Sequence, residues 1–103
     1  MIVVSIIYPA TAESKFNIEY YQHKHLPLIK ERWGTCGLTA ATFLQGIGTP
    51  DGGPAAYHMI ALLTFDSPES FQEAAQRHGK EIMSDIKNFT NVRPAVQLNT
   101  QFG

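Results

Sequence analysis

Short apolar runs alternate along the chain with two longer stretches of helical periodicity. Three runs, residues 2–8, 38–47 and 57–65, are rich in β-branched and aromatic residues and predict strands. A fourth run, residues 92–100, predicts another strand. The segments after the first and third runs repeat apolar residues at three- and four-residue spacing, which predicts helices. The predicted order is β-α-β-β-α-β, the split βαβ arrangement of an α+β, ferredoxin-like fold with a four-stranded antiparallel sheet.

Capping residues and a proline define the first predicted helix. Asn17 is a favoured helix cap and Gly34 a favoured stop, so the helix should run between them. Pro27 lies inside this helix, where it removes a backbone hydrogen bond and clashes with the preceding turn. We therefore expect the helix to kink or break near residues 25–26, giving two short pieces.

The second predicted helix begins at Ser67-Pro68-Glu69, a cap followed by a first-position proline and an acid. It should reach about His78, bend at Gly79 and resume from Lys80 to Asn88. The glycine-rich residues 46–55 are interpreted as a hairpin loop. They do not form a phosphate-binding motif, because no helix follows them.

Both faces of the predicted sheet are apolar. In residues 2–8 the apolar side chains fall on both sides, and residues 57–65 alternate in the same way. Helices can cover only one of these faces. We therefore expect two sheets to pack face to face across a two-fold axis, which makes a homodimer with the architecture of a dimeric α/β barrel.

Length and composition support a small protein of this kind. The 103 residues fit one domain, placed over residues 1–103. Charged residues make up 17%, below the usual value of about 25%, which favours burial against a second copy. Eight basic and nine acidic residues leave a net charge of −1, so neither nucleic acid nor an anionic membrane is an expected partner.

The cellular setting is predicted from what the chain contains. Cys36 is the single cysteine, which favours a reducing compartment, and we interpret it as a small turn residue. The first residues lack the charged leader of a signal peptide. No apolar run approaches the roughly 20 residues of a membrane span. We therefore expect a soluble, cytoplasmic protein.

Helical phase separates the two histidines of the first helix. Tyr21 and His25 are four residues apart and share the apolar stripe that should face the sheet. His23 aligns instead with Glu19 on the solvent side. The two histidines are therefore not expected to hold a metal together.

The second helix carries further candidate residues. His78 continues its inward stripe, and Asp85 follows if the helix stays straight past Gly79. His25, His78 and Asp85 are thus expected to converge between helices and sheet, with Tyr21 nearby. A neutral imidazole beside a carboxylate can act as a general acid or base near neutral pH.

Each candidate also has a structural interpretation. His25 can be a core histidine bonded to the backbone, or a residue that stabilises the kink at Pro27. His78 near a helix end can simply complement the helix dipole. Asp85 can be a solvated surface residue, although an acid near a helix C-terminus runs against the dipole and so favours a structural or functional partner. The sequence contains no HExxH, CxxC or Gly-x-Ser-x-Gly motif, so it predicts no dedicated zinc site. The predicted chemistry of His25 needs neither a metal nor a flavin, and no cofactor is expected.

Two motifs and a short C-terminal pattern resemble those of a known family. They are Tyr20-Tyr21-x-x-x-His25-x-Pro27-Leu28, His78-Gly79-x-x-x-Met83-x-Asp85-Ile86-x-Asn88-Phe89-Thr90 and Pro94-x-x-Gln97. With them the chain resembles, over nearly its whole length, the EthD family of small dimeric α/β-barrel proteins. The resemblance implies a ferredoxin-like protomer that pairs through its sheets.

The resemblance also implies a range of functions. The family is named after a component of bacterial ethyl tert-butyl ether degradation and is often classed as oxidoreductase. Related proteins look like cofactor-free decarboxylases, dehydratases or monooxygenases. By position, the polar pocket residues are His25, His78 and Asp85, and the residues that contact a small hydrophobic or aromatic molecule are Tyr21, Phe89 and Gln97. Two other functions stay open: a ligand-binding or accessory protein of an oxygenase system, and a haem-binding barrel that uses His78.

Overall fold

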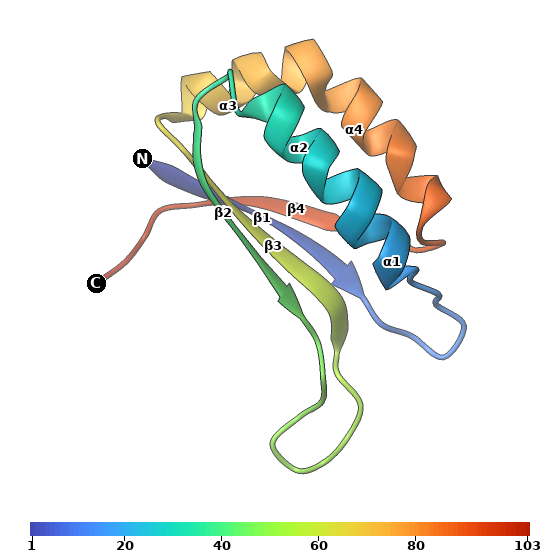
Figure 1. The fold of residues 1–103 in the computed structure, drawn as a ribbon. Helices are drawn as coiled ribbons and strands as arrows, with labels where there is room; N and C mark the ends of the chain where they lie inside the picture. Colours follow the sequence, from blue (N-terminus) through green and yellow to red (C-terminus); the bar gives the residue numbers. More distant parts are fainter.

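The computed structural model describes residues 1–103 as one antiparallel sheet with two helical segments on one of its faces (Figure 1). The strand order in the sheet is β2-β3-β1-β4. The strands are β1 (Ile2–Pro9), β2 (Leu38–Gln45), β3 (Tyr57–Phe65) and β4 (Ala95–Asn99). The predicted α+β, ferredoxin-like order is confirmed.

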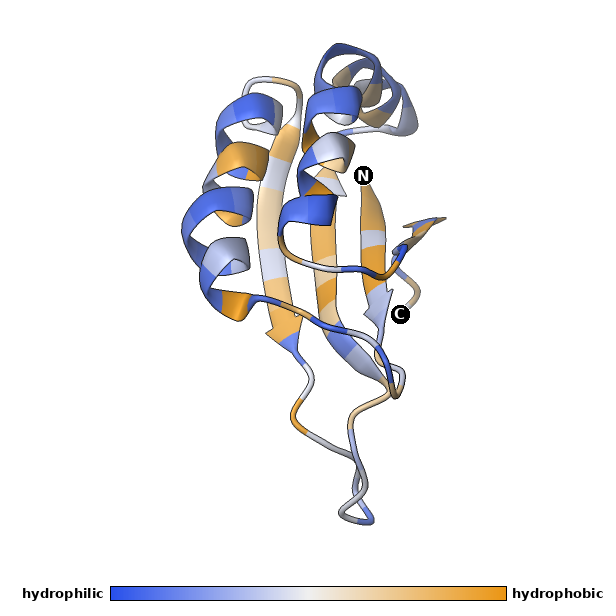
Figure 2. Ribbon diagram, turned by 90° about the vertical axis from the view of Figure 1, so that its right-hand side faces the viewer, coloured by the Kyte–Doolittle hydropathy of each residue, from blue (hydrophilic) through white to orange (hydrophobic).

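Alternation along the central strands sends one set of side chains towards the helices. Val4 pairs with Leu63 and Ile6 with Ala61, and all four are buried. They belong to a cluster of 15 buried hydrophobic residues between the sheet and the helices. Figure 2 shows hydrophobic residues along the strands and hydrophilic residues over much of the outer helix surface. Removing this apolar surface from water is the main stabilisation of the fold.

The opposite face of the sheet is also apolar, as predicted. It is formed by side chains that the helices do not cover, including the half-buried residues Val3, Ile7, Ile60 and Leu62. Leu44 on the neighbouring strand pairs with Ile60 and is 47% exposed. We call this surface the open sheet face.

The first helical segment runs without a break through Pro27. It consists of α1 (Ile18–Tyr20), the π-helical turn η1 (Tyr21–His25) and α2 (Leu26–Trp33). Of the expected kink or break near residues 25–26, the break into two separate pieces is wrong, and the irregularity there is a π turn. In the π turn the Leu26 N–H donates to the Tyr21 carbonyl, five residues earlier. A wider turn of this kind accommodates the proline without ending the helix.

The second helical segment begins at the predicted cap, and a π turn ends at Gly79, where a bend was predicted. It consists of α3 (Pro68–Ala74), the π turn η2 (Ala75–Gly79), α4 (Lys80–Asp85) and the 3₁₀ turn η3 (Ile86–Asn88). Ser67 caps it, because its Oγ accepts the Ser70 N–H at 3.0 Å. Gly79 keeps helical dihedral angles, so the irregularity is a π turn and not a change of direction at glycine.

Two strands are shorter than predicted. β2 ends at Gln45, and Gly46 follows at a position where a Cβ would collide with the Tyr57 carbonyl oxygen. β4 begins only at Ala95. The residues before Ala95 form a loop instead. A hydrogen bond from Thr90 Oγ1 to the Lys15 carbonyl, 2.6 Å long, anchors the start of this loop.

None of the helices has both the length and the apolar character that a membrane-spanning segment requires.

Candidate functional site

His25 lies at the end of the π turn η1 and points into the core. Its side chain is only 1% exposed. The Tyr21 ring stacks on it at a centroid distance of 5.4 Å, and the Phe89 ring lies 4.6 Å away. The predicted inward orientation of His25 is therefore observed. An imidazole in such apolar surroundings needs a polar partner, because an unpaired buried polar group costs free energy.

The partner is Asp85, at the end of α4. His25 Nδ1 and Asp85 Oδ2 are 2.9 Å apart. The second carboxylate oxygen, Oδ1, accepts the Tyr20 hydroxyl at 2.6 Å and the Asn88 side-chain amide at 3.0 Å. Three donors thus hold a carboxylate that stands at a helix C-terminus, where the helix dipole alone would disfavour it.

The surroundings favour a neutral imidazole beside an ionised carboxylate. Burial lowers the pKa of His25 below its ordinary value, by more than the contact with Asp85 raises it. Burial raises the pKa of Asp85, but the hydrogen bonds from Tyr20, His25 and Asn88 outweigh this effect and leave that pKa below its ordinary value. The bond to Asp85 raises the pKa of the Tyr20 hydroxyl, so it stays a donor.

This arrangement fixes the tautomer of His25. An ionised carboxylate only accepts hydrogen bonds, so the proton of the neutral ring lies on Nδ1. Nε2 is then left with a free lone pair and makes no hydrogen bond to another side chain. A histidine whose Nδ1–H is held by a carboxylate is a typical general base, and in its protonated form a general acid.

An open groove between the two helical segments reaches Asp85 from the outer surface. Its volume is about 420 Å³, and it is lined by Tyr20, Lys24, Leu28, Glu81, Ser84, Asp85 and Asn88. The Asp85 side chain is 15% exposed. His25 itself lines no cavity, so Asp85 is the hydrogen-bonded link between the buried ring and the groove.

An apolar cleft lies on the other side of the first helix, against the sheet. Its volume is about 230 Å³, and it is lined by Ile18, Tyr21, Gln22, Leu26, Phe43, Gln45 and Met59. Tyr21 is therefore shared between the cleft and the stack on His25. Its buried hydroxyl has no hydrogen-bond partner, which is rare in folded proteins.

The structure brings some of the predicted site residues together and leaves others apart. Tyr21 and Phe89 both contact the His25 ring. His78 is half-buried, makes no hydrogen bond or ion pair, and lines none of the cavities. Gln97 pairs with Ser5 in the β1–β4 register, which places it on the open sheet face, across the sheet from His25.

Two residues of the site, Tyr20 and Asn88, were not among the predicted site residues. Both appear in the family-like motifs, and Asn88 follows Asp85 by three residues, so the two share a helix face. Tyr20 shares the outer face of its helix with Lys24. The missing information was that these two outer faces approach each other closely enough for Tyr20 to reach Asp85.

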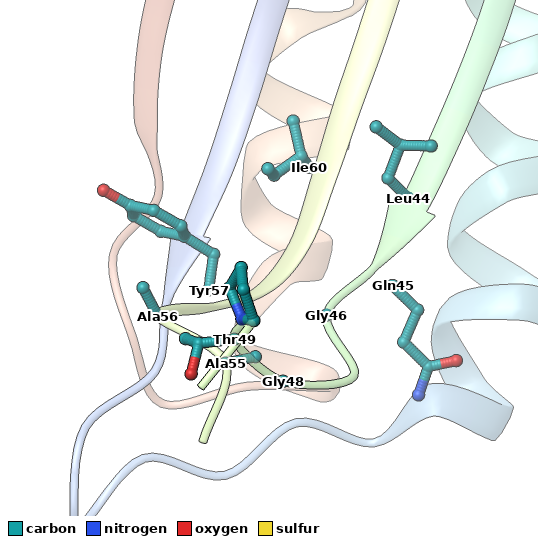
Figure 3. A pocket seen from close by; sticks show the side chains of 10 residues that line it. Leu44, Gln45, Gly46, Gly48, Thr49, Ala55, Ala56, Tyr57 and Ile60 are labelled. Atoms are coloured by element: carbon teal, nitrogen blue, oxygen red, sulfur yellow. The ribbon is translucent and has the colours of Figure 1, made fainter. Parts of the chain in front are cut away.

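A further cavity lies under the hairpin loop between β2 and β3 (Figure 3). Its volume is about 270 Å³, and it opens beside Leu44, Ile60 and Tyr57. Tyr57 is the sole titratable residue of its lining, so this cavity offers little acid–base chemistry. Nowhere in the structure do three His, Cys, Asp or Glu side chains converge as potential metal ligands.

Fold and site together define a small ferredoxin-like protein with a buried histidine paired to a partly exposed carboxylate. The model of the EthD domain matches residues 9–93, and the chain therefore belongs to the EthD family. No curated protein matches the chain.

Solved structures agree with this assignment. An EthD-like protein from Ralstonia eutropha JMP134 is 33% identical, with 95% of this chain and 88% of that one covered and a TM-score of 0.87. An ethyl tert-butyl ether degradation (EthD) family protein from Bacillus halodurans C-125 is 18% identical, with 99% of each chain covered and a TM-score of 0.72. A dimeric ferredoxin-like protein from an uncultured marine organism is 16% identical, with 100% and 96% covered and a TM-score of 0.56.

Proposed function

We propose that this EthD-family protein binds a small apolar or aromatic molecule, and that His25 exchanges a proton with it as a general base or acid. The observation that carries the proposal is the 2.9 Å contact between His25 Nδ1 and Asp85 in a buried, aromatic environment. A ring held in this way is neutral and basic at Nε2 near neutral pH. The lowered pKa of His25 supports the same conclusion.

The apolar cleft beside Tyr21 is the proposed binding site. Its 230 Å³ are below the roughly 300–1,000 Å³ of common ligand pockets, which suits a molecule of one or two rings. Tyr21 lies between the cleft and the His25 ring, so a ligand in the cleft would reach His25 if the Tyr21 side chain rotated away. The Tyr21 hydroxyl makes no hydrogen bond that would oppose this rotation. A polar group on the ligand would also satisfy that hydroxyl, whose burial without a partner costs about 1–3 kcal/mol.

Proton transfer is the chemistry that these side chains supply by themselves. It is sufficient for a lyase-type reaction such as decarboxylation or dehydration, in which a proton is removed at one step and returned at another. An oxidation would in addition need an oxidant bound beside the substrate. The site residues therefore favour a lyase over an oxidoreductase.

The test combines ligand detection with isotope exchange. A panel of phenols and aryl ketones with one or two rings is screened for binding by ligand-observed NMR. Compounds that bind are incubated in D₂O, and exchange of their acidic C–H protons is followed by mass spectrometry. We expect His25→Ala to abolish the exchange, because Nε2 is the proposed base.

His23→Ala is the matched control, because His23 lies on the same helix but is 65% exposed and paired with Glu19. It should exchange protons at the wild-type rate. Exchange that is equally fast in folded His25→Ala would contradict the proposal. Binding without exchange in any variant would favour the ligand-binding or accessory function instead.

Haem binding through His78 has less support. The side chain is half-buried, but it borders no cavity in which a flat macrocycle would fit. His78 therefore has no assigned step in the proposed chemistry. A Soret band that appears on adding haem and is lost in His78→Ala would restore this function.

We also propose that the open sheet face is covered by a second copy of the chain, which makes a homodimer. The face carries the half-buried apolar residues of β1 and β3 together with Leu44, and no element of the protomer covers it. A related ferredoxin-like structure is described as dimeric. Face-to-face packing of two such sheets would bury the apolar surface on both sides.

A further inference from the structure

The two oxygens of Asp85 have different partners. Oδ2 lies 2.9 Å from His25 Nδ1, whereas Oδ1 accepts the Tyr20 hydroxyl at 2.6 Å and the Asn88 amide at 3.0 Å. The Asn88 amide also lies 3.4 Å from the Tyr20 hydroxyl, so these two donors lie next to each other at a single oxygen atom, Oδ1. Tyr20 comes from the first helical segment and Asn88 from the second, and both segments therefore determine where the carboxylate lies.

We infer that Tyr20 and Asn88 are positioning residues that act on His25 through Asp85: by binding one carboxylate oxygen, they limit the strength of the Asp85–His25 hydrogen bond. This inference rests on the proposed function and deepens it. A stronger acceptor at Oδ2 would make His25 more basic, and a weaker one would make it less basic.

The physical reason is competition for the charge of one carboxylate. Each donor bound to Oδ1 stabilises the negative charge, so less of it is available to the His25 Nδ1–H. Removing a donor makes Asp85 a stronger acceptor. The His25 Nδ1–H bond should then strengthen and the pKa of His25 should rise.

The other charged and titratable groups around the pair do not bind the carboxylate. Glu81 and Lys24 line the same groove, and Glu81 is engaged by Arg32 at 2.9 Å. Tyr8 and Tyr21 lie on the core side, and burial raises the pKa of both hydroxyls, so they stay neutral. The two Oδ1 donors are therefore the groups through which the pair can be tuned.

The experiment uses Tyr20→Phe, Asn88→Ala and the double variant. The control is Tyr57→Phe, because the Tyr57 hydroxyl makes no hydrogen bond and Tyr57 borders only the hairpin cavity. NMR on protein with ¹⁵N-labelled histidine follows two quantities: the chemical shift of the His25 Nδ1 proton and the pKa of the ring. The first can be read at neutral pH, so it remains measurable if a variant unfolds in acid.

We expect a downfield shift of the Nδ1 proton and a rise in the pKa of His25 in Tyr20→Phe and Asn88→Ala, larger in the double variant. Tyr57→Phe should match the wild type. A proton shift and a pKa that stay unchanged in both single variants, or that move the opposite way, would overturn the inference.

These outcomes are independent of any substrate. If the Nδ1 proton moves as expected but His25→Ala retains full proton exchange on bound ligands, the positioning role stands and the proposed catalytic role fails. If the Nδ1 proton does not move but His25→Ala loses the proton exchange, His25 acts on ligands without being tuned through Oδ1.

Discussion

A neutral imidazole donates a hydrogen bond to an ionised carboxylate in this protein, and this arrangement depends on the balance of two opposing effects. Burial alone would make His25 a weak base and Asp85 a weak acid. The hydrogen-bond donors around Asp85 outweigh the effect of burial on the pKa of Asp85, whereas the pKa of His25 stays lowered by burial. The result is a ring that carries one proton, on Nδ1, and presents a free Nε2.

The same balance predicts how stability depends on pH. Folding lowers the pKa of both His25 and Asp85, so in acid the unfolded chain binds more protons than the folded one. The free energy of unfolding should therefore fall as the pH drops below the ordinary histidine pKa of about 6.5, and fall further through the carboxylate range. Urea denaturation at a series of pH values between about 7.5 and 5 measures this loss.

His25→Gln removes one titrating group, and its stability should depend less steeply on pH than that of the wild type above about pH 5. His23→Gln is the control, because His23 is largely exposed, and it should retain the wild-type dependence. Identical pH dependence in wild type and His25→Gln would show that His25 is not the group responsible.

Part of this site could be predicted from the sequence. Four-residue spacing places Tyr21 and His25 on one inward stripe, and an acid near a helix C-terminus, Asp85, needs a partner. The bond from Tyr20 could not be predicted, because it depends on how closely two helix surfaces approach. The position of Gln97 could not be predicted from its motif either, since pairing with Ser5 decides which sheet face it occupies.

Among the elements, the helix that carries His25 is the most informative. Its π turn adds a residue to one turn, and His25 is the last residue of that turn. π turns inside helices are frequent at functional sites. The sequence placed an irregularity near residues 25–26, but propensity alone could not show whether the helix would break or continue through a wider turn.

The cap of this helix provides a test at the same scale. Asn17 Oδ1 accepts the Tyr20 N–H at 3.1 Å and satisfies one of the free donors of the first turn. Asn17→Ala should reduce the free energy of unfolding by about 1 kcal/mol, measured by urea denaturation. Asn17→Asp keeps the cap and adds a favourable charge, so it should be at least as stable as the wild type. Equal losses in both variants would mean that the cap does not stabilise the helix.

At the scale of the whole molecule, the sheet has a covered face and an open one. The alternation in β1 and β3 was sufficient to predict that both faces are apolar, because strand residues alternate strictly between faces. Homodimer formation is a proposal that follows from the open face. Stable interfaces usually bury about 800 Å² on each partner, which sets the size of interface that the proposed dimer needs.

A charged substitution on the open sheet face tests the proposed dimer. Leu62→Glu places a carboxylate in the middle of this face and should shift the protein from dimer to monomer in sedimentation velocity at micromolar concentrations. Ile47→Glu is the control, because Ile47 is 97% exposed in the hairpin loop, and this variant should sediment as the wild type does. A wild-type protein that is monomeric under these conditions would contradict the proposed dimer.

The titration of His25 in the wild type and in Asp85→Asn, followed by NMR on protein with ¹⁵N-labelled histidine, tests the central claim most directly. We predict a neutral ring near neutral pH, with its proton on Nδ1 and a pKa below the ordinary value of about 6.5. Asp85→Asn should lower that pKa further, because the negative charge that stabilises the imidazolium is lost. A charged ring at neutral pH, a proton on Nε2 instead of Nδ1, or a pKa that does not respond to Asp85→Asn would contradict a carboxylate-held base at this site.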